Sequence, residues 1–200
     1  MKNRVFTRNI KTVYVAGDLH GDNDSFMKIL SFYNKAEKDS LLIFLGDYAD
    51  RGKQGVEIIT KLNDLLDSHE NIIALKGNHE LYINGKPDFA PSNLVDEAKS
   101  KYASWDTFYS EVLSQFIAKL YIAAIINNVL FVHGGVSSDI KTIHDIADGT
   151  NEKILLWSDP SLIKGEHKDR RGAGVEFGEE ITDKVLSSLG LKLIVRSHEP

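Results

Sequence analysis

Five short apolar segments of this chain each run into polar residues of the types that bind metal ions, and this repeated pattern constrains the fold most. The segments are residues 12–16, 41–45, 71–75, 129–132 and 191–195. Continuous apolar runs of four to six residues are typical of strands that are buried on both faces. The sequence therefore predicts a sheet whose strands end in a set of polar side chains.

Helical patterns lie between these predicted strands. Apolar residues recur at helical spacing within residues 22–34 and 53–68, and residues 92–119 indicate two further helices. Residues 179–189 are predicted to form a helix that opens with acidic residues, which the helix dipole favours at that end. Alternation of strands and helices favours an α/β fold with parallel strands. Residues 121–126 and 129–132 flank Asn127 and Asn128, a pair that suits a two-residue hairpin turn. That hairpin adds antiparallel pairing, so the sheets are predicted to be mixed.

Composition narrows the class of protein. The chain has 200 residues, 42% hydrophobic and 26% charged, and it has no cysteine. A length of this order suits one domain, expected here over residues 1–200. Without cysteine there is no disulfide framework, no Cys-bound zinc and no thiol nucleophile. A net charge of −5 gives no indication of a nucleic-acid surface.

The sequence also bears on the expected location of the protein. Residues 1–8 contain no apolar stretch of the kind found in signal peptides. The longest apolar run, residues 120–126, is far too short to span a membrane. We therefore expect a soluble, cytoplasmic protein that contacts neither membrane nor nucleic acid.

The polar residues that follow the strands have the chemistry of a metal site. They are Asp18, His20, Asp47, Asn78, His133 and His198. In open α/β sheets, ligands bind at the carboxyl ends of the strands. Oxygen and imidazole donors without sulfur suit Mn, Fe or Zn ions. Asp47 lies midway in the series and could bridge two ions, and a two-metal site of this kind can act on a phosphate group.

Seven motifs in order give these residues a context. They are residues 17–21 (GDLHG), 46–52 (GDYADRG), 77–80 (GNHE), 131–135 (FVHGG), 157–160 (WSDP), 171–178 (RGAGVEFG) and 196–198 (RSH). Together they resemble the serine/threonine branch of the phosphoprotein phosphatase family, within the metallophosphoesterase superfamily, and the short pattern resembles its prokaryotic members. The resemblance implies a four-layer α/β/β/α sandwich with mixed sheets.

The resemblance also implies roles for the metal-binding residues. Asp18 and His20 would bind a first ion, and Asp47 would bridge two divalent ions. Asn78, His133 and His198 would complete the second site. Mn is the expected metal, with Fe or Zn as alternatives.

The remaining roles concern catalysis. By the resemblance, His79 is the general acid, Asp50 orients it, and Arg51 and Arg171 clamp the phosphate. A nearby carboxylate raises the pKa of an imidazole, and the planar guanidinium binds two phosphate oxygens at once. Arg170 competes with Arg171, but the spacing to residues 177–178 favours Arg171.

The function that follows is a metal-dependent serine/threonine protein phosphatase. It would hydrolyse phosphomonoesters on phosphorylated proteins by direct attack of a hydroxide held between the two ions. A dinucleoside polyphosphate hydrolase is an alternative, against which segments 157–160 and 171–178 argue. A non-catalytic binding module with this fold is a second alternative, against which the complete set of ligands argues.

Some parts of the chain depart from the family pattern or have a structural interpretation. Catalytic domains of the family continue beyond the position of Pro200, so we expect the family's C-terminal strands to be lacking here. Residues 81–109 differ from the eukaryotic enzymes and are predicted to shape substrate access. Glu80 is predicted to be a structural hydrogen-bonding partner, and Tyr48 and Trp105 to be packing residues.

Overall fold

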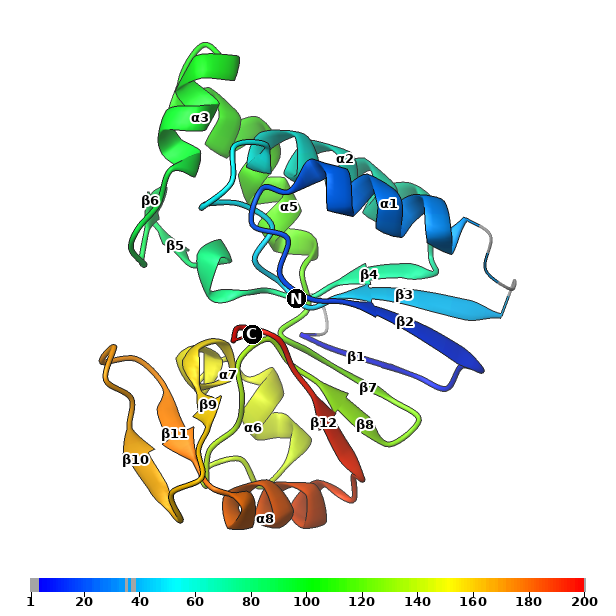
Figure 1. The fold of residues 1–200 in the computed structure, drawn as a ribbon, viewed down its shortest axis with the longest axis vertical. Helices are drawn as coiled ribbons and strands as arrows, with labels where there is room; N and C mark the ends of the chain where they lie inside the picture. Colours follow the sequence, from blue (N-terminus) through cyan, green and yellow to red (C-terminus); the bar gives the residue numbers. More distant parts are fainter. Residues whose placement is uncertain (1–3, 35, 37–38, 200) are drawn as a thin grey trace. The chain divides into compact units, whose positions relative to one another are not determined.

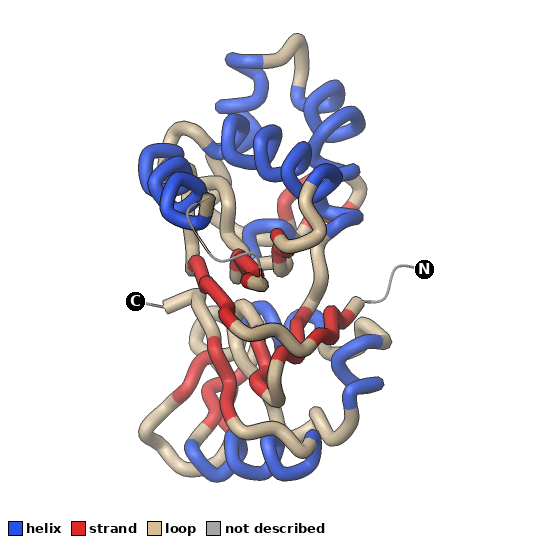
Figure 2. Tube along the Cα trace, turned by 90° about the vertical axis from the view of Figure 1, so that its right-hand side faces the viewer, coloured by secondary structure: helices blue, strands red, loops and turns tan. Residues whose placement is uncertain are grey.

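Two parts of the chain fold as separate units in the computed structural model, which describes residues 4–34, 36 and 39–199 (Figure 1). The first unit is residues 11–120, and the second combines residues 1–10 with residues 121–200. In both units short strands alternate with helices and are joined by loops (Figure 2). The predicted mixed α/β fold is confirmed. Among the described residues, no helix is both long and apolar enough to cross a membrane.

The first unit is built on a parallel sheet of three strands. The strands are β2 (Thr12–Ala16), β3 (Ser40–Phe44) and β4 (Ile72–Ala74), in the order β2-β3-β4. Two helices, α1 (Asn23–Tyr33) and α2 (Gly55–Ser68), connect them in sequence. Asp22 caps α1 by accepting a hydrogen bond from the Ser25 amide at 3.0 Å. The strands and helices predicted for this part of the chain are therefore present, with bounds shifted by one or two residues.

The rest of the first unit is mostly helical. It contains the 3₁₀ turn η1 (Asn78–Glu80), the hairpin β5 (Tyr82–Ile83) and β6 (Lys86–Pro87), the helices α3 (Leu94–Lys101), α4 (Trp105–Phe108) and α5 (Ser114–Lys119), and the π-helical turn η2 (Tyr109–Leu113). Because α4, η2 and α5 follow one another without a break, the two helices predicted within residues 92–119 are confirmed. The hairpin was not predicted, since its strands have only two residues each.

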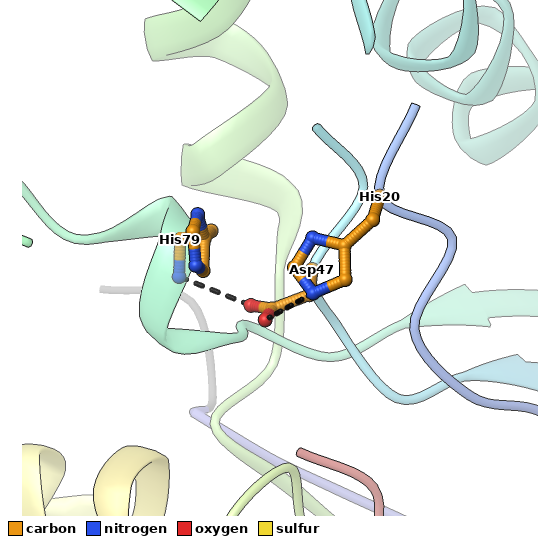
Figure 3. Close-up of side chains that lie close together, drawn as sticks. All are labelled: His20, Asp47 and His79. Carbon is orange, nitrogen blue, oxygen red and sulfur yellow. Dashed lines mark hydrogen bonds and ion pairs between the residues drawn. The ribbon is translucent and has the colours of Figure 1, made fainter. Parts of the chain in front are cut away.

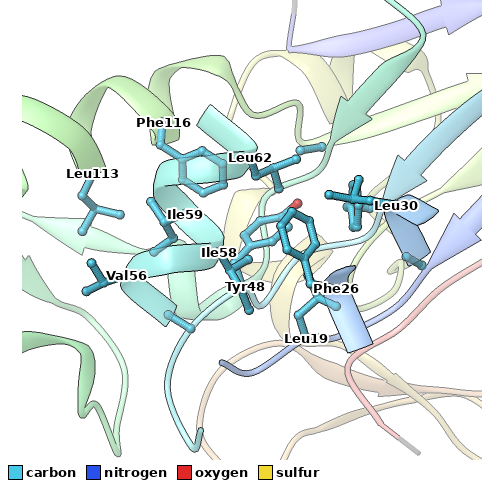
Figure 4. Close-up of a cluster of buried hydrophobic side chains, with 14 of the residues drawn as sticks. Leu19, Phe26, Leu30, Tyr48, Val56, Ile58, Ile59, Leu62, Leu113 and Phe116 are labelled. Atoms are coloured by element: carbon cyan, nitrogen blue, oxygen red, sulfur yellow. The ribbon is translucent and has the colours of Figure 1, made fainter. Parts of the chain in front are cut away.

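A single apolar cluster holds the first unit together (Figure 4). Phe26 and Leu30 of α1, Ile58 and Leu62 of α2 and Phe116 of α5 are all buried in it. These helical residues are spaced so that one face of each helix is apolar, which is why the helices cover the sheet.

The second unit contains a mixed sheet of four strands. They are β1 (Val5–Arg8), β7 (Ala123–Ile126), β8 (Val129–Phe131) and β12 (Leu193–Val195), in the order β1-β7-β8-β12. β7 and β8 are antiparallel, and the outer strands pair with them in parallel. Asn127 and Asn128 adopt φ values of 51° and 64°, so the predicted two-residue hairpin turn is confirmed.

A smaller sheet and three helices complete the second unit. The strands are β9 (Asp159–Pro160), β10 (Glu166–Lys168) and β11 (Val175–Phe177), and the helices are α6 (Ile143–Ala147), α7 (Glu152–Trp157) and α8 (Glu179–Leu189). Only α8 was predicted. It ends at Gly190, whose φ of 67° suits a glycine at the end of a helix.

One expectation about the strands is wrong in part. Strand β3 is buried along its whole length, but β2 and β12 are partly exposed, with Val15 45% and Leu193 52% accessible. Both strands lie at an edge of their sheets in the described structure. An edge strand has a neighbour on one side only, so an apolar run does not by itself ensure burial.

Candidate active site

Three loops meet at the carboxyl edge of the parallel sheet in the first unit. Asp18 and His20 follow β2, Asp47 follows β3, and Asn78 follows β4. The amides of Leu19 and His20 both donate to the Asp47 carbonyl, at 3.0 and 2.9 Å, which ties the first loop to the second. The sheet thus gathers on one edge four of the side chains that the sequence selects.

His20, Asp47 and His79 lie close enough to share one cation (Figure 3). One potential ligand atom from each lies within 4.8 Å of the others. His20 Nε2 is 3.4 Å from an Asp47 oxygen and 3.7 Å from an Asp18 oxygen. These distances suit ligands arranged around an ion.

The His20 ring is oriented as a ligand. Its Nδ1 lies 3.0 Å from the carbonyl of Ala49, which places the proton on Nδ1 and the lone pair on Nε2. Nε2 is buried and has no hydrogen-bond partner among the described residues. A buried polar atom without a partner is costly, and a bound cation would satisfy it. Burial lowers the pKa of His20, so the ring is held in the neutral form that metals bind.

Asp47 is buried in surroundings that disfavour the ionised form of its carboxyl group. Burial raises its pKa to about 6, and the Asp18 charge adds to this, while His79 and His20 oppose it. A divalent cation would favour the ionised carboxylate again. The donor chemistry therefore fits a metal ion in this part of the first unit.

The backbone around these residues is strained. His20, Asp47, Asp50 and Arg51 have φ values of 43°, 55°, 65° and 62°. Residues other than glycine adopt such values at a cost of about 1–3 kcal/mol each, and they concentrate at functional sites. Gly77 is also constrained, because a Cβ there would lie 2.2 Å from an Asp47 oxygen.

The buried carboxylate of Glu80 links the loop after β3 to the loop after β4. One of its carboxylate oxygens accepts hydrogen bonds from the amides of Asp47 and Gly77, both at 2.9 Å, and the other accepts from Tyr48 at 3.1 Å. Burial and the Asp47 charge raise the pKa of Glu80 to about 8, against the effect of the amide donors. The predicted structural role of Glu80 is confirmed. So is that of Tyr48, which is buried and donates to the Leu75 carbonyl.

We expect a Glu80→Gln variant to lose about 1–3 kcal/mol of unfolding free energy at pH 6, below the pKa of about 8, where the wild-type carboxyl group is neutral and both of its oxygens can still accept hydrogen bonds. The Gln side chain carries one acceptor oxygen, so its NH₂ group must face at least one backbone N–H. Urea denaturation of the metal-free protein measures the loss. The matched control is Glu57→Gln, which removes a charge from an exposed pair with Lys101 and should cost below about 1 kcal/mol. Equal losses in the two variants would contradict the prediction.

His79 and Asp50 form a buried acid–base pair. His79 Nδ1 lies 2.9 Å from an Asp50 oxygen. The other Asp50 oxygen accepts hydrogen bonds from the amides of Asn93 and Leu94, at 2.6 and 2.9 Å, at the start of α3. These contacts fix Asp50, and Asp50 in turn fixes Nδ1 of the His79 imidazole. The other ring nitrogen, Nε2, is then left to act on a substrate.

The charge state of this pair suits a proton donor. Burial alone would lower the pKa of His79, but the hydrogen bond to Asp50 and the surrounding carboxylates raise it overall. Burial would likewise raise the pKa of Asp50, yet the bonds from His79 and from the Leu94 and Asn93 amides lower it. A protonated imidazole beside an ionised carboxylate is the arrangement expected of a general acid at neutral pH. Arg51 is exposed in the adjacent turn.

The second unit carries its own part of the predicted set. His133 follows β8 and His198 follows β12, its parallel neighbour, and both are buried. Their ring centroids are 5.0 Å apart, and the Ser197 amide donates to the His133 carbonyl at 2.9 Å. His198 has a φ of 77°, the same left-handed strain as in the first unit.

Arg171 is held by a network of acids. Its guanidinium donates to both oxygens of Asp169, at 3.0 and 2.9 Å, and also to Asp159. Asp159 also accepts from Arg196, and Arg171 Nη1 lies 2.7 Å from His198 Nε2. The network orients the Arg171 guanidinium, and the side chain stays partly accessible to solvent. The hydrogen bond from Arg171 lowers the pKa of Asp169.

Sequence reasoning missed three members of this network. Asp159 lies in the motif 157–160 and Arg196 in the motif 196–198, but neither was predicted to bind Arg171 or phosphate. Asp169 lies two residues before the motif that begins at Arg171. An acid two residues before a predicted phosphate-binding arginine is a signal that could have found Asp169. The structure gives no preference for Arg170, which is exposed and lies outside this network.

Comparison with known proteins gives a consistent result. The family model described as calcineurin-like phosphoesterase matches residues 11–200. A protein of Encephalitozoon cuniculi that is named as a probable serine/threonine-protein phosphatase is 36% identical over 99% of this chain and 44% of its own length. A serine/threonine-protein phosphatase of Caenorhabditis elegans is 32% identical over 94% of this chain and 42% of its own length.

A solved structure agrees with these relatives. It is a protein serine/threonine phosphatase from Saccharomyces cerevisiae, with similarity to human phosphatase PP5. It superposes with a TM-score of 0.85 at 28% identity, and the match covers 99% of this chain and 65% of that one. The chain thus spans less than half the length of the two curated relatives named above.

Proposed function

The chain belongs to the calcineurin-like phosphoesterase family, and from that premise we propose that it is a metal-dependent serine/threonine protein phosphatase. Its substrates would be phosphomonoesters of serine and threonine in proteins. The observation that carries the proposal is the buried His79–Asp50 pair beside His20 and Asp47. This arrangement places a proton donor next to a cation-binding group. The names of the relatives point to the same activity.

We propose that the protein binds two divalent metal ions through the six residues selected from the sequence. They are Asp18, His20, Asp47, Asn78, His133 and His198. The unpartnered Nε2 of His20 and the raised pKa of Asp47 support a cation in the first unit. When bound, such ions would neutralise charge on a phosphate group and act as Lewis acids. Oxygen and imidazole donors suit Mn, and they also admit Fe or Zn.

The chain's own residues perform the proton transfer. His79 Nδ1 is held by Asp50, so Nε2 would give its proton to the leaving alkoxide of serine or threonine. Such an alkoxide is a poor leaving group unless it is protonated. Arg51 and Arg171 would bind phosphoryl oxygens and meet the charge that develops on them. The acids that hold Arg171 would keep its guanidinium oriented before a substrate arrives.

Phosphate release from a phosphoserine peptide tests the proposal. Metal-stripped protein is assayed with and without Mn²⁺, and phosphotyrosine peptide and diadenosine tetraphosphate are compared as substrates. We expect release that needs the metal and that favours phosphoserine. Preference for the dinucleotide would support the alternative hydrolase. Failure of folded, metal-loaded protein to hydrolyse any of the three, followed as phosphate release from the peptides and as nucleotide products from the dinucleotide, would contradict an enzymatic function.

An Asp50→Asn variant should move the alkaline limb of the kcat–pH profile to lower pH. Asp50 raises the pKa of His79, so removing its charge lowers that pKa. Since a general acid must be protonated to act, activity would then be lost at a lower pH than in the wild type. The measurement is kcat against pH on a phosphoserine peptide at saturating metal.

The control for this variant is Asp64→Asn, which removes an exposed carboxylate from α2. It should leave the profile in place. A limb that stays unchanged in Asp50→Asn, or moves to higher pH, would show that Asp50 does not set the protonation of His79.

A further inference from the structure

The segment between the acid–base pair and α4 forms an aromatic support that the sequence did not reveal. Trp105 Nε1 donates to the Gly85 carbonyl at 2.8 Å, which ties the β5–β6 turn to α4. The Tyr82 and Trp105 rings stack at a centroid distance of 5.8 Å and an interplanar angle of 29°. The Tyr109 ring lies 6.0 Å from Tyr82 and 5.9 Å from Trp105. The hairpin is therefore held by large, rigid side chains.

Phe89 connects this support to the acid–base pair. Its ring centroid is 4.5 Å from that of His79, at an interplanar angle of 48°. The Phe89 ring also meets Tyr82 edge to face, with centroids 5.6 Å apart. The neighbouring backbone is fixed as well, because the Asp88 amide donates to the Leu81 carbonyl at 2.8 Å. Phe89 thus has a defined position against the imidazole.

The His79 ring needs more than one contact to keep its orientation. The hydrogen bond from Nδ1 to Asp50 fixes one atom at the edge of the ring. A ring fixed at one edge can still tilt about that bond, and tilting moves Nε2 away from a leaving group. A ring packed at 4.5 Å opposes the tilt, since close-packed neighbours allow little movement.

From these contacts we propose that Phe89 is a positioning residue that holds the His79 imidazole in its proton-donating orientation. The inference rests on the proposed phosphatase activity and names a residue that serves it. Phe89 acts through His79 and makes no chemical contribution of its own. Tyr82 and Trp105 support it in turn.

Substrates that differ in their need for a proton donor test this role. A phosphoserine peptide releases an alkoxide that must be protonated, whereas p-nitrophenyl phosphate releases a stable anion. For Phe89→Ala we expect kcat on the peptide to fall by about tenfold to a hundredfold. The kcat on p-nitrophenyl phosphate should fall less than about threefold, within what a general acid contributes to a good leaving group. KM for both substrates should stay close to the wild-type value.

Three further variants complete the experiment. Phe89→Tyr keeps the ring and should restore the peptide rate. Phe89→Leu keeps apolar volume without the ring and should show the same selective loss, and it replaces the Ala variant if that one does not fold. Phe32→Ala removes an aromatic ring that is 66% exposed on α1 and should leave both rates unchanged.

The outcomes separate this inference from the proposed function. Equal losses on the two substrates would overturn it, because they would show a general structural role. A change confined to KM would also overturn it, because Phe89 would then contact the substrate. A wild-type protein that is inactive on both substrates would instead contradict the proposed function itself.

Discussion

An Asp47→Asn variant should lose metal-dependent phosphate release by at least about a thousandfold and should also bind metal more weakly. The carboxylate is buried at the convergence of the loops, so a bound ion would depend on its charge. A bound ion would supply several kcal/mol of charge stabilisation in the transition state, and about 4 kcal/mol corresponds to a factor of a thousand. Kinetic assays on a phosphoserine peptide and calorimetric titration with Mn²⁺ measure the two losses.

The same variant should not be less stable than the wild type without metal. Burial raises the pKa of Asp47 to about 6, so near pH 7 the folded protein carries a carboxylate that is costly to keep ionised. The wild type therefore loses stability as pH rises through this pKa, and an Asn side chain avoids that loss. Its amide oxygen can still accept from the His79 amide, as an Asp47 oxygen does at 3.0 Å. A lower melting temperature for metal-free Asp47→Asn would contradict this account.

The second large effect is expected for His79→Asn, with a fall in kcat of about 10²–10⁴-fold on a phosphoserine peptide. The variant removes the proton donor, while the amide of residue 79 still bonds to Asp47. Metal binding should therefore stay close to the wild-type value. Steady-state kinetics combined with titration of Mn²⁺ tests both statements.

His79 also belongs to the group of side chains that could share a cation, which gives this experiment a clear opposite outcome. If His79→Asn loses bound metal in proportion to activity, His79 is a ligand and the acid lies elsewhere. The control is His69→Asn, because His69 stands outside every motif, at the end of α2. It should change neither metal binding nor rate.

Local sequence was sufficient for much of the fold. The apolar runs predicted β2, β3, β4, β8 and β12, helical spacing predicted α1 and α2, and acidic residues at its start predicted α8. These signals are readable because each such element buries apolar side chains, and their spacing within the element's own residues differs between helices and strands. Strands β9, β10 and β11 escaped prediction, since segments of two or three residues are too short to show periodicity and pair only when distant segments meet.

The sequence by itself determined which residue types stand at the ends of the strands, and hence the chemistry expected of the protein. Only the tertiary structure decided how those residues are held. The three amides at Glu80, the acids around Arg171 and the ring of Phe89 against His79 all join residues through packing or hydrogen bonds. Such contacts depend on where loops of irregular backbone bring side chains in space. A linear pattern records the spacing of residues along one element, and it carries no distance between two loops.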